Sequence, residues 1–172
     1  MRRFVFGFIA GIIVLPAAAL AFARLGFVDP RADIPVGALE RRIAMPSLDA
    51  SVERRAPAVP TPPDSSHDAL VAGMKVYEAH CALCHGDGAQ PDAALSDALY
   101  PRAPQFVREA PDMPYYENLY ITEHGVRMTG MPAWGRILPD SQLRQVTTFL
   151  AHMDHLPAAL AAQWKAGAAL PH

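Results

Sequence analysis

The sequence predicts an all-α fold, in which a small domain follows an N-terminal apolar segment. Three observations support this prediction. A charge-free apolar stretch runs from Phe4 to Ala23. Between Asp68 and His80, apolar side chains recur every three or four residues, which is the period of a helix with one buried face. A further helix is expected after Pro139, in a stretch that contains Val146 and Phe149.

The N-terminal apolar stretch predicts export from the cytoplasm. Its 20 residues, at ~1.5 Å each, can cross the ~30 Å hydrocarbon core of a bilayer. It has no polar face that a soluble helix would turn to water. Arg2 and Arg3 precede it, which favours a cytoplasmic N-terminus. We therefore expect residues 1–23 to anchor the protein in the inner membrane with the remainder in the periplasm. Cleavage after Ala23, in the small-x-small run that begins at Ala21, would instead release a soluble periplasmic protein.

Residues 24–66 are predicted to form a stem that tethers the domain while letting it reach partners. This stem contains seven prolines and ends in a Pro/Ala/Thr/Ser spacer, Ala56 to Ser66, that should be extended. Short helices are conceivable at Leu39–Met45 and Leu48–Arg55, although Pro46 separates them.

The charge distribution argues against a nucleic-acid partner and suggests a protein partner with a basic surface. The chain has 15 Lys and Arg against 17 Asp and Glu with no long basic run, so nucleic-acid binding has no electrostatic support. From Asp64 onward, seven basic residues face twelve acidic ones. An acidic domain of this kind suits a basic docking surface on a partner protein.

The two cysteines of the chain lie in the run Cys81-Ala-Leu-Cys84-His85. A pair with this spacing could be a redox dithiol, half of a zinc site or a haem attachment site. A thioredoxin-type dithiol would follow a strand, whereas a helix is predicted here, and no further cysteines exist for a four-cysteine zinc site. Two cysteines so spaced can form thioether bonds to the haem vinyl groups, and the next histidine then meets the iron. We therefore predict one covalent haem c, held by Cys81, Cys84 and His85.

The segment 68–156 resembles the monohaem cytochromes c of the class I type. The resemblance is carried by the haem motif, by the pattern Gly73-x-x-x-Tyr77 before it, and by the run Thr129-Gly-Met-Pro-Ala-Trp134 after it. It implies a class I cytochrome c domain at 67–156, followed by a C-terminal extension at 157–172 to which no role is assigned.

The resemblance also implies how such a domain is held together. Its N- and C-terminal helices would cross around the haem, with Gly73 and Tyr77 meeting Val146 and Phe149.

The sixth iron ligand is expected to be Met131. It lies 46 residues beyond His85 in a Gly-Met-Pro run that resembles the axial-ligand loop of the family. A thioether opposite a histidine raises the haem potential. Met128 is the competing methionine and His124 the rival histidine.

Several residues are candidates for contacts around the haem. Trp134 and Arg127 carry donors that could satisfy the haem propionates. The run 100–104 is similar to the family loop that offers a backbone carbonyl to the proximal histidine's Nδ1–H. Either Pro101 or Pro104 would provide that carbonyl.

These features together predict an electron carrier rather than an enzyme. With both axial positions filled, no open site remains for substrate, and single electrons would pass between membrane redox complexes or soluble carriers. One alternative is a cytochrome subunit of a larger oxidase or dehydrogenase complex. Another is a gas-binding or peroxide-reducing protein in which Met131 is labile.

Overall fold

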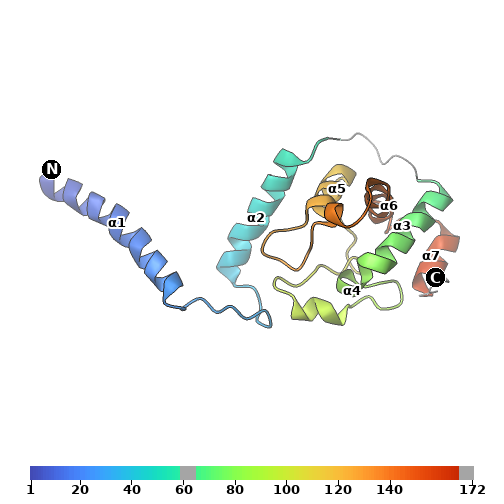
Figure 1. The fold of residues 1–172 in the computed structure, drawn as a ribbon, viewed down its shortest axis with the longest axis horizontal. Coiled ribbons are helices and arrows are strands. Elements are labelled where there is room, and N and C mark those ends of the chain that lie inside the picture. Colours follow the sequence, from blue (N-terminus) through green and yellow to red (C-terminus); the bar gives the residue numbers. More distant parts are fainter. Residues whose placement is uncertain (59–64, 167–172) are drawn as a thin grey trace. The chain divides into compact units, whose positions relative to one another are not determined.

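The computed structural model describes residues 1–58 and 65–166, in which helices occur and no strand does (Figure 1). The all-α prediction is confirmed. The chain divides into two compact units, residues 1–31 and a second unit that begins at Ala32. The elements in chain order are α1 (Arg2–Arg24), α2 (Ala38–Arg55), α3 (His67–His80), α4 (Ala82–His85), the 3-10 helix η1 (Ala94–Ala98), α5 (Tyr115–His124), the 3-10 helix η2 (Trp134–Arg136), α6 (Asp140–Leu150) and α7 (Ala158–Lys165).

Helix α1 accounts for most of the first unit. It is 23 residues long, its most apolar window has a mean hydropathy of 2.5, and none of that window is buried. Pro16 lies inside it without ending it. By length and composition α1 is able to cross a membrane, as an anchor does, and a signal sequence meets the same criterion.

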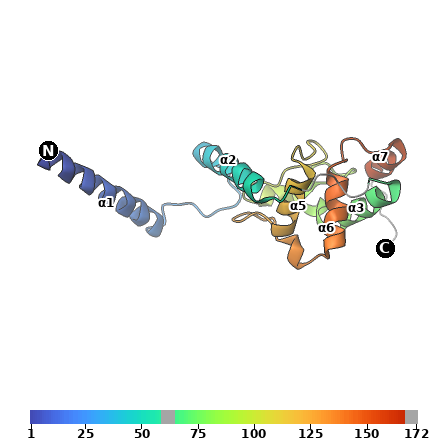
Figure 2. The same cartoon turned by 90° about the horizontal axis from the view of Figure 1, so that it is seen from above.

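The core of the second unit is the crossing of α3 with α6 (Figure 1, Figure 2). At Gly73 the two backbones approach so closely that a Cβ atom would lie 2.2 Å from the carbonyl oxygen of Gln145 and 2.7 Å from the Cβ of Phe149. One turn further along α3, the rings of Tyr77 and Phe149 meet with centroids 5.6 Å apart. Val146 is fully buried in the same cluster. The predicted helix crossing is therefore present.

Helix α7 extends this core beyond the crossing helices. Trp164 is buried, with its ring edge-on to Tyr77 at 5.4 Å and to Phe149 at 5.2 Å. Leu160 is fully buried beside them. A Cβ atom at Gly88 would lie 2.0 Å from the Trp164 carbonyl oxygen, so the loop after α4 also packs closely against α7. The C-terminal extension thus completes the core, as far as its described residues reach; residues 167–172 lie outside them.

Helix α2 is where the structure differs most from the expected stem. It runs without interruption from Ala38 to Arg55, with Pro46 inside, instead of forming two short helices. A proline removes one backbone hydrogen bond and crowds the preceding turn. The helical partner that Pro46 cannot supply is the donor to the Arg42 carbonyl oxygen. The hydroxyl of Ser47 donates to the next carbonyl oxygen, that of Ile43, at 2.6 Å.

The C-terminal half of α2 also packs on the domain. Val52 is 3% exposed and Ala56 is buried, and α2 contacts α5. The hydroxyl of Tyr100 donates to the Glu40 carboxylate, which joins the other half of α2 to the loop after η1. Part of the stem is therefore docked on the domain, while most of the expected extended spacer, residues 59–64, lies outside the described part of the chain.

Candidate functional site

The two cysteines lie where α3 gives way to α4. The Cys81 N–H donates to the Tyr77 carbonyl oxygen at 2.7 Å, which closes α3, and the His85 N–H donates back to the Cys81 carbonyl oxygen at 2.9 Å. Cys81 and Cys84 are both free thiols and partly buried. Gly86 then ends α4 with a φ of +78°, a conformation that glycine adopts without strain. Both thiols and the imidazole therefore come from one short helical turn.

The environment of Cys81 is unlike that of a redox dithiol. Burial, with the neighbouring Cys84 as a second cause, raises the pKa of the Cys81 thiol to about 12. In catalytic dithiols the pKa of the attacking cysteine is lowered instead, because its reactive form is the thiolate. The helix that precedes the pair is likewise not the strand that a thioredoxin-type site requires.

The His85 ring is held on two sides by the loop after η1. Its Nδ1 lies 2.9 Å from the Pro104 carbonyl oxygen, and its ring stacks on Phe106 with centroids 4.3 Å apart and planes 4° apart. The Phe106 N–H also donates to the His85 carbonyl oxygen at 3.2 Å. Of the two prolines left open by the sequence, it is Pro104 and not Pro101 that faces the ring.

The same contacts set the chemical state of His85. A proton on Nδ1 is donated to Pro104, which leaves Nε2 as the nitrogen with a lone pair for a metal. Burial lowers the pKa of His85, and the backbone hydrogen bond to Pro104 opposes that shift only in part. The neutral ring is the form that ligates metals.

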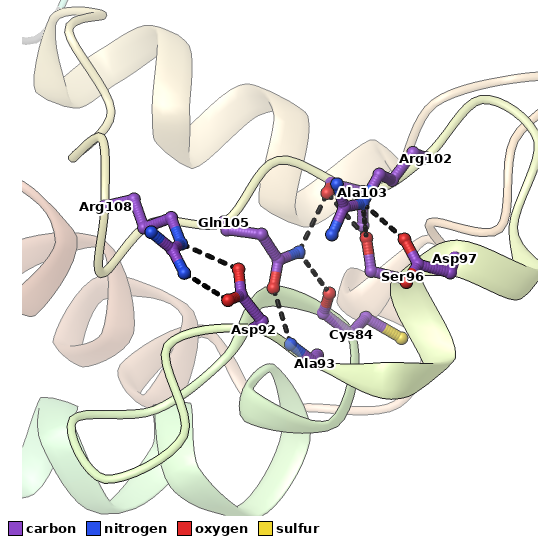
Figure 3. Close-up of polar contacts among 9 residues, drawn as sticks. All are labelled: Cys84, Asp92, Ala93, Ser96, Asp97, Arg102, Ala103, Gln105 and Arg108. Atoms are coloured by element: carbon purple, nitrogen blue, oxygen red, sulfur yellow. Dashed lines mark hydrogen bonds and ion pairs between the residues drawn. The ribbon is translucent and has the colours of Figure 1, made fainter. Parts of the chain in front are cut away.

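A polar network that the sequence did not indicate surrounds this loop (Figure 3). The Gln105 amide nitrogen donates to the carbonyl oxygens of Cys84 at 3.0 Å and Ala103 at 2.9 Å, and its oxygen accepts the Ala93 N–H at 2.7 Å. The buried Ser96 hydroxyl donates to the same Ala103 carbonyl at 2.9 Å. Most of these partners are backbone groups, so no pattern of residue types could have revealed the network.

The loop that carries Met131 is closed by its own hydrogen bonds. The Thr129 hydroxyl donates to the Val126 carbonyl oxygen at 2.8 Å and accepts the Met131 N–H at 3.1 Å. The Val126 N–H donates to the Met131 carbonyl oxygen at 3.3 Å. Met131 is partly buried, whereas Met128 is 88% exposed and has a positive φ of 62°. The two competing methionines are thus in very different environments.

The other residues that the sequence singled out, Trp134, Arg127 and His124, differ in how far they are buried. Trp134 is partly buried against the core, and its ring meets that of His80, one residue before Cys81, at 5.4 Å. This contact joins the segment that follows Met131 to the end of α3. Arg127 is exposed. His124 is also exposed and packs its ring against Tyr120 at 4.5 Å.

The side chains present suit a covalent haem. Two free thiols two residues apart, a neutral imidazole with Nε2 available and a thioether on a closed loop form the donor set that haem c requires. Together with the glycine-mediated crossing of α3 and α6, they define a cytochrome c domain of the class I type. Such a domain performs haem-based electron transfer.

Comparison with known families gives a more specific similarity for this domain. Residues 68–150 match the sequence model of the family described as cytochrome c oxidase, cbb3-type, subunit III. The matched segment runs from the start of α3 to the end of α6 and includes the cysteines, His85 and Met131. No curated protein matches the chain.

Proposed function

We propose that the protein carries one haem c, bound through Cys81 and Cys84 and ligated by His85 and Met131, and that it passes single electrons between redox proteins. When bound, the haem supplies a one-electron iron couple. The observation that carries the proposal is the 2.9 Å contact between His85 Nδ1 and the Pro104 carbonyl oxygen. It selects the tautomer with Nε2 free and holds the ring in one orientation.

The loop around Met131 supports the second half of the ligand set. Its hydrogen bonds through Thr129 restrict where the thioether can lie. A soft thioether suits iron(II) and raises the potential when it faces a histidine. If His85 and Met131 both hold the iron, no open position would remain for substrate, which favours a carrier over an enzyme.

A redox titration of the detergent-extracted protein, followed by absorption, tests this function. We expect one one-electron transition, haem that stays attached after denaturation, and slow binding of carbon monoxide to the reduced form. Haem released by denaturation would contradict covalent attachment. Rapid binding of carbon monoxide would favour the gas-binding or peroxide-reducing alternative, because a firmly held Met131 blocks that position.

Trp134 and Arg127 are proposed as donors to the haem propionates. The partial burial of Trp134 and the place of both residues beside the ligand loop support this. A cation near the haem favours the reduced iron, so Arg127→Gln is expected to lower the potential, less so at high salt. An unchanged reduction potential of Arg127→Gln at low salt would contradict the proposed contact of Arg127 with the haem propionates.

We further propose that α1 anchors the protein in the inner membrane and that the haem domain lies in the periplasm. The length and hydropathy of α1, and the two arginines ahead of it, support this orientation. The mass of the mature protein tests retention, because cleavage after Ala23 would remove residues 1–23.

A role as the cytochrome subunit of a larger oxidase is the second candidate, and the description of the matched family favours it. Extraction in mild detergent separates the two roles. A stoichiometric partner that co-purifies would support a subunit. A haem protein that purifies alone and exchanges electrons with added carriers at a salt-dependent rate would support an independent carrier.

A further inference from the structure

Gln105 lies between the two residues that hold the His85 ring. Pro104, before it, offers its carbonyl oxygen to His85 Nδ1, and Phe106, after it, stacks on the ring. Any movement of the Gln105 backbone would therefore move a hydrogen-bond acceptor and a stacking partner of the same imidazole. The side chain of Gln105 makes its hydrogen bonds within the polar network described above.

The Gln105 amide joins three backbone segments (Figure 3). Its nitrogen donates to the Cys84 carbonyl oxygen in α4 and to the Ala103 carbonyl oxygen in its own loop, at 3.0 and 2.9 Å. Its oxygen accepts from the Ala93 N–H just before η1, at 2.7 Å. Both donor hydrogens and the acceptor are thus used, which no other side chain of this length can reproduce.

We propose that Gln105 is a positioning residue for His85: by tying its loop to Cys84 and Ala93, it fixes the Pro104 carbonyl at the Nδ1 edge of the imidazole and the Phe106 ring against its face. This inference rests on the proposed role of His85 as the proximal ligand. The physical reason is that a loop held only by its ends has several conformations of similar free energy, whereas hydrogen bonds to two separate segments, with a third inside the loop, favour one.

The exposed ion pair of Arg108 with Asp92 provides a matched control (Figure 3). Arg108 lies three residues after Gln105 in the same loop, and its partner Asp92 lies in the segment before η1. The side chains of Arg108 and Asp92 are 61% and 49% exposed. Such pairs contribute little to stability. If His85 were held by general loop stability, breaking this pair should disturb the ring as much as changing Gln105.

Two substitutions separate the hydrogen bonds from the packing of the side chain. Gln105→Glu keeps the size and the acceptor for the Ala93 N–H, but places a second carboxylate oxygen against the carbonyl oxygens of Cys84 and Ala103. Gln105→Met keeps the length and removes every hydrogen bond, and it provides the test if the Glu variant does not fold. Arg108→Gln is the control.

The measurement is NMR of the full haem protein. In the reduced, diamagnetic form, hydrogen exchange of the His85 Nδ1–H and the Ala93 N–H reports opening of the loop. In the oxidised form, the shifts of the haem methyl groups report the orientation of the axial imidazole. We expect both Gln105 variants to accelerate exchange at His85 by roughly tenfold or more and to move the methyl shifts. Arg108→Gln should leave both unchanged.

The inference is overturned if the rate of hydrogen exchange at the His85 Nδ1–H in the Gln105 variants is within twofold of the wild-type rate and the haem methyl shifts are unchanged. It is also overturned if Arg108→Gln changes that rate and those shifts as much as the Gln105 variants do. In either case the proposed electron-transfer function stands as long as the His85 resonances carry the shifts of an iron ligand. Absence of those shifts in the wild-type protein would instead contradict the proposed ligation itself.

Discussion

The hydroxyl of Tyr77 donates a 2.9 Å hydrogen bond to the carbonyl oxygen of Gly86, which directly follows His85. Tyr77 is fully buried in the crossing of α3 and α6. Burial raises the pKa of its hydroxyl well above the usual range, so the hydroxyl remains a donor throughout the neutral and moderately alkaline range. One hydrogen bond therefore connects Tyr77, a residue of the core, to the segment that carries His85.

Replacing Tyr77 by phenylalanine should test that connection. Tyr77→Phe keeps the ring packing but leaves the Gly86 carbonyl oxygen without this donor, at a cost of about 1–2 kcal/mol in the free energy of unfolding. Denaturant titration followed by far-UV circular dichroism measures it. Tyr116→Phe, at a less buried ring, is the control and should change stability by less than about 0.5 kcal/mol. Equal effects of the two substitutions would show that the bond to Gly86 contributes nothing specific.

The contribution of α7 can be measured at Trp164. Trp164→Ala would leave a cavity against Tyr77 and Phe149 and should cost about 3–5 kcal/mol in the free energy of unfolding. Lys165→Ala, on the exposed side of the same helix, should have little effect. If Trp164→Ala changed the free energy of unfolding as little as Lys165→Ala, α7 would not be part of the stabilising core.

The close approach of α3 and α6 makes a prediction for Gly73. The Cβ atom of Gly73→Ala would meet the backbone of Gln145 at 2.2 Å, so α6 must shift. We expect a loss of about 1–3 kcal/mol, despite the higher helix propensity of alanine. Ala79→Ser adds an atom to the exposed side of α3 and is the control. A stabilised Gly73→Ala protein, measured by thermal unfolding, would contradict the close crossing.

The ion pair of Asp92 with Arg108 predicts a pH dependence. The hydrogen bond from Arg108 lowers the pKa of Asp92 in the folded protein below its unfolded value. Its contribution is therefore present above the unfolded pKa and is lost as pH falls through the folded pKa. Asp92→Asn should be slightly less stable than wild type at pH 7, and the difference should vanish in strong acid. A difference that is independent of pH would mean that charge is not its source.

The sequence predicted those features that depend on local spacing. Cys81, Cys84 and His85 need only a run of five residues on one helical turn. The helix crossing at Gly73 and Tyr77 was expected only through the resemblance to the class I cytochromes c. Which of Pro101 and Pro104 faces His85 depends on the path of the loop, so the residue types alone left it open.

Other features could not be predicted because their partners are distant or carry no sequence signature. Gln105 binds backbone groups, which every residue possesses. The docking of α2 rests on Val52, the buried residue of a polar helix that contains Pro46, and on Ala56, which directly follows the helix. Trp164 reaches the core across a loop, from a short alanine-rich helix whose own pattern is weak.

The most direct test of the central claim compares Met131→Ala with Met128→Ala in the oxidised haem protein. A methionine sulfur bound to iron(III) gives a charge-transfer band in the red region of the spectrum. We predict that the wild-type protein and Met128→Ala show this band, because Met128 is exposed, and that Met131→Ala loses it and has a lower reduction potential. A band that survives in Met131→Ala would show that Met131 is not the sixth ligand.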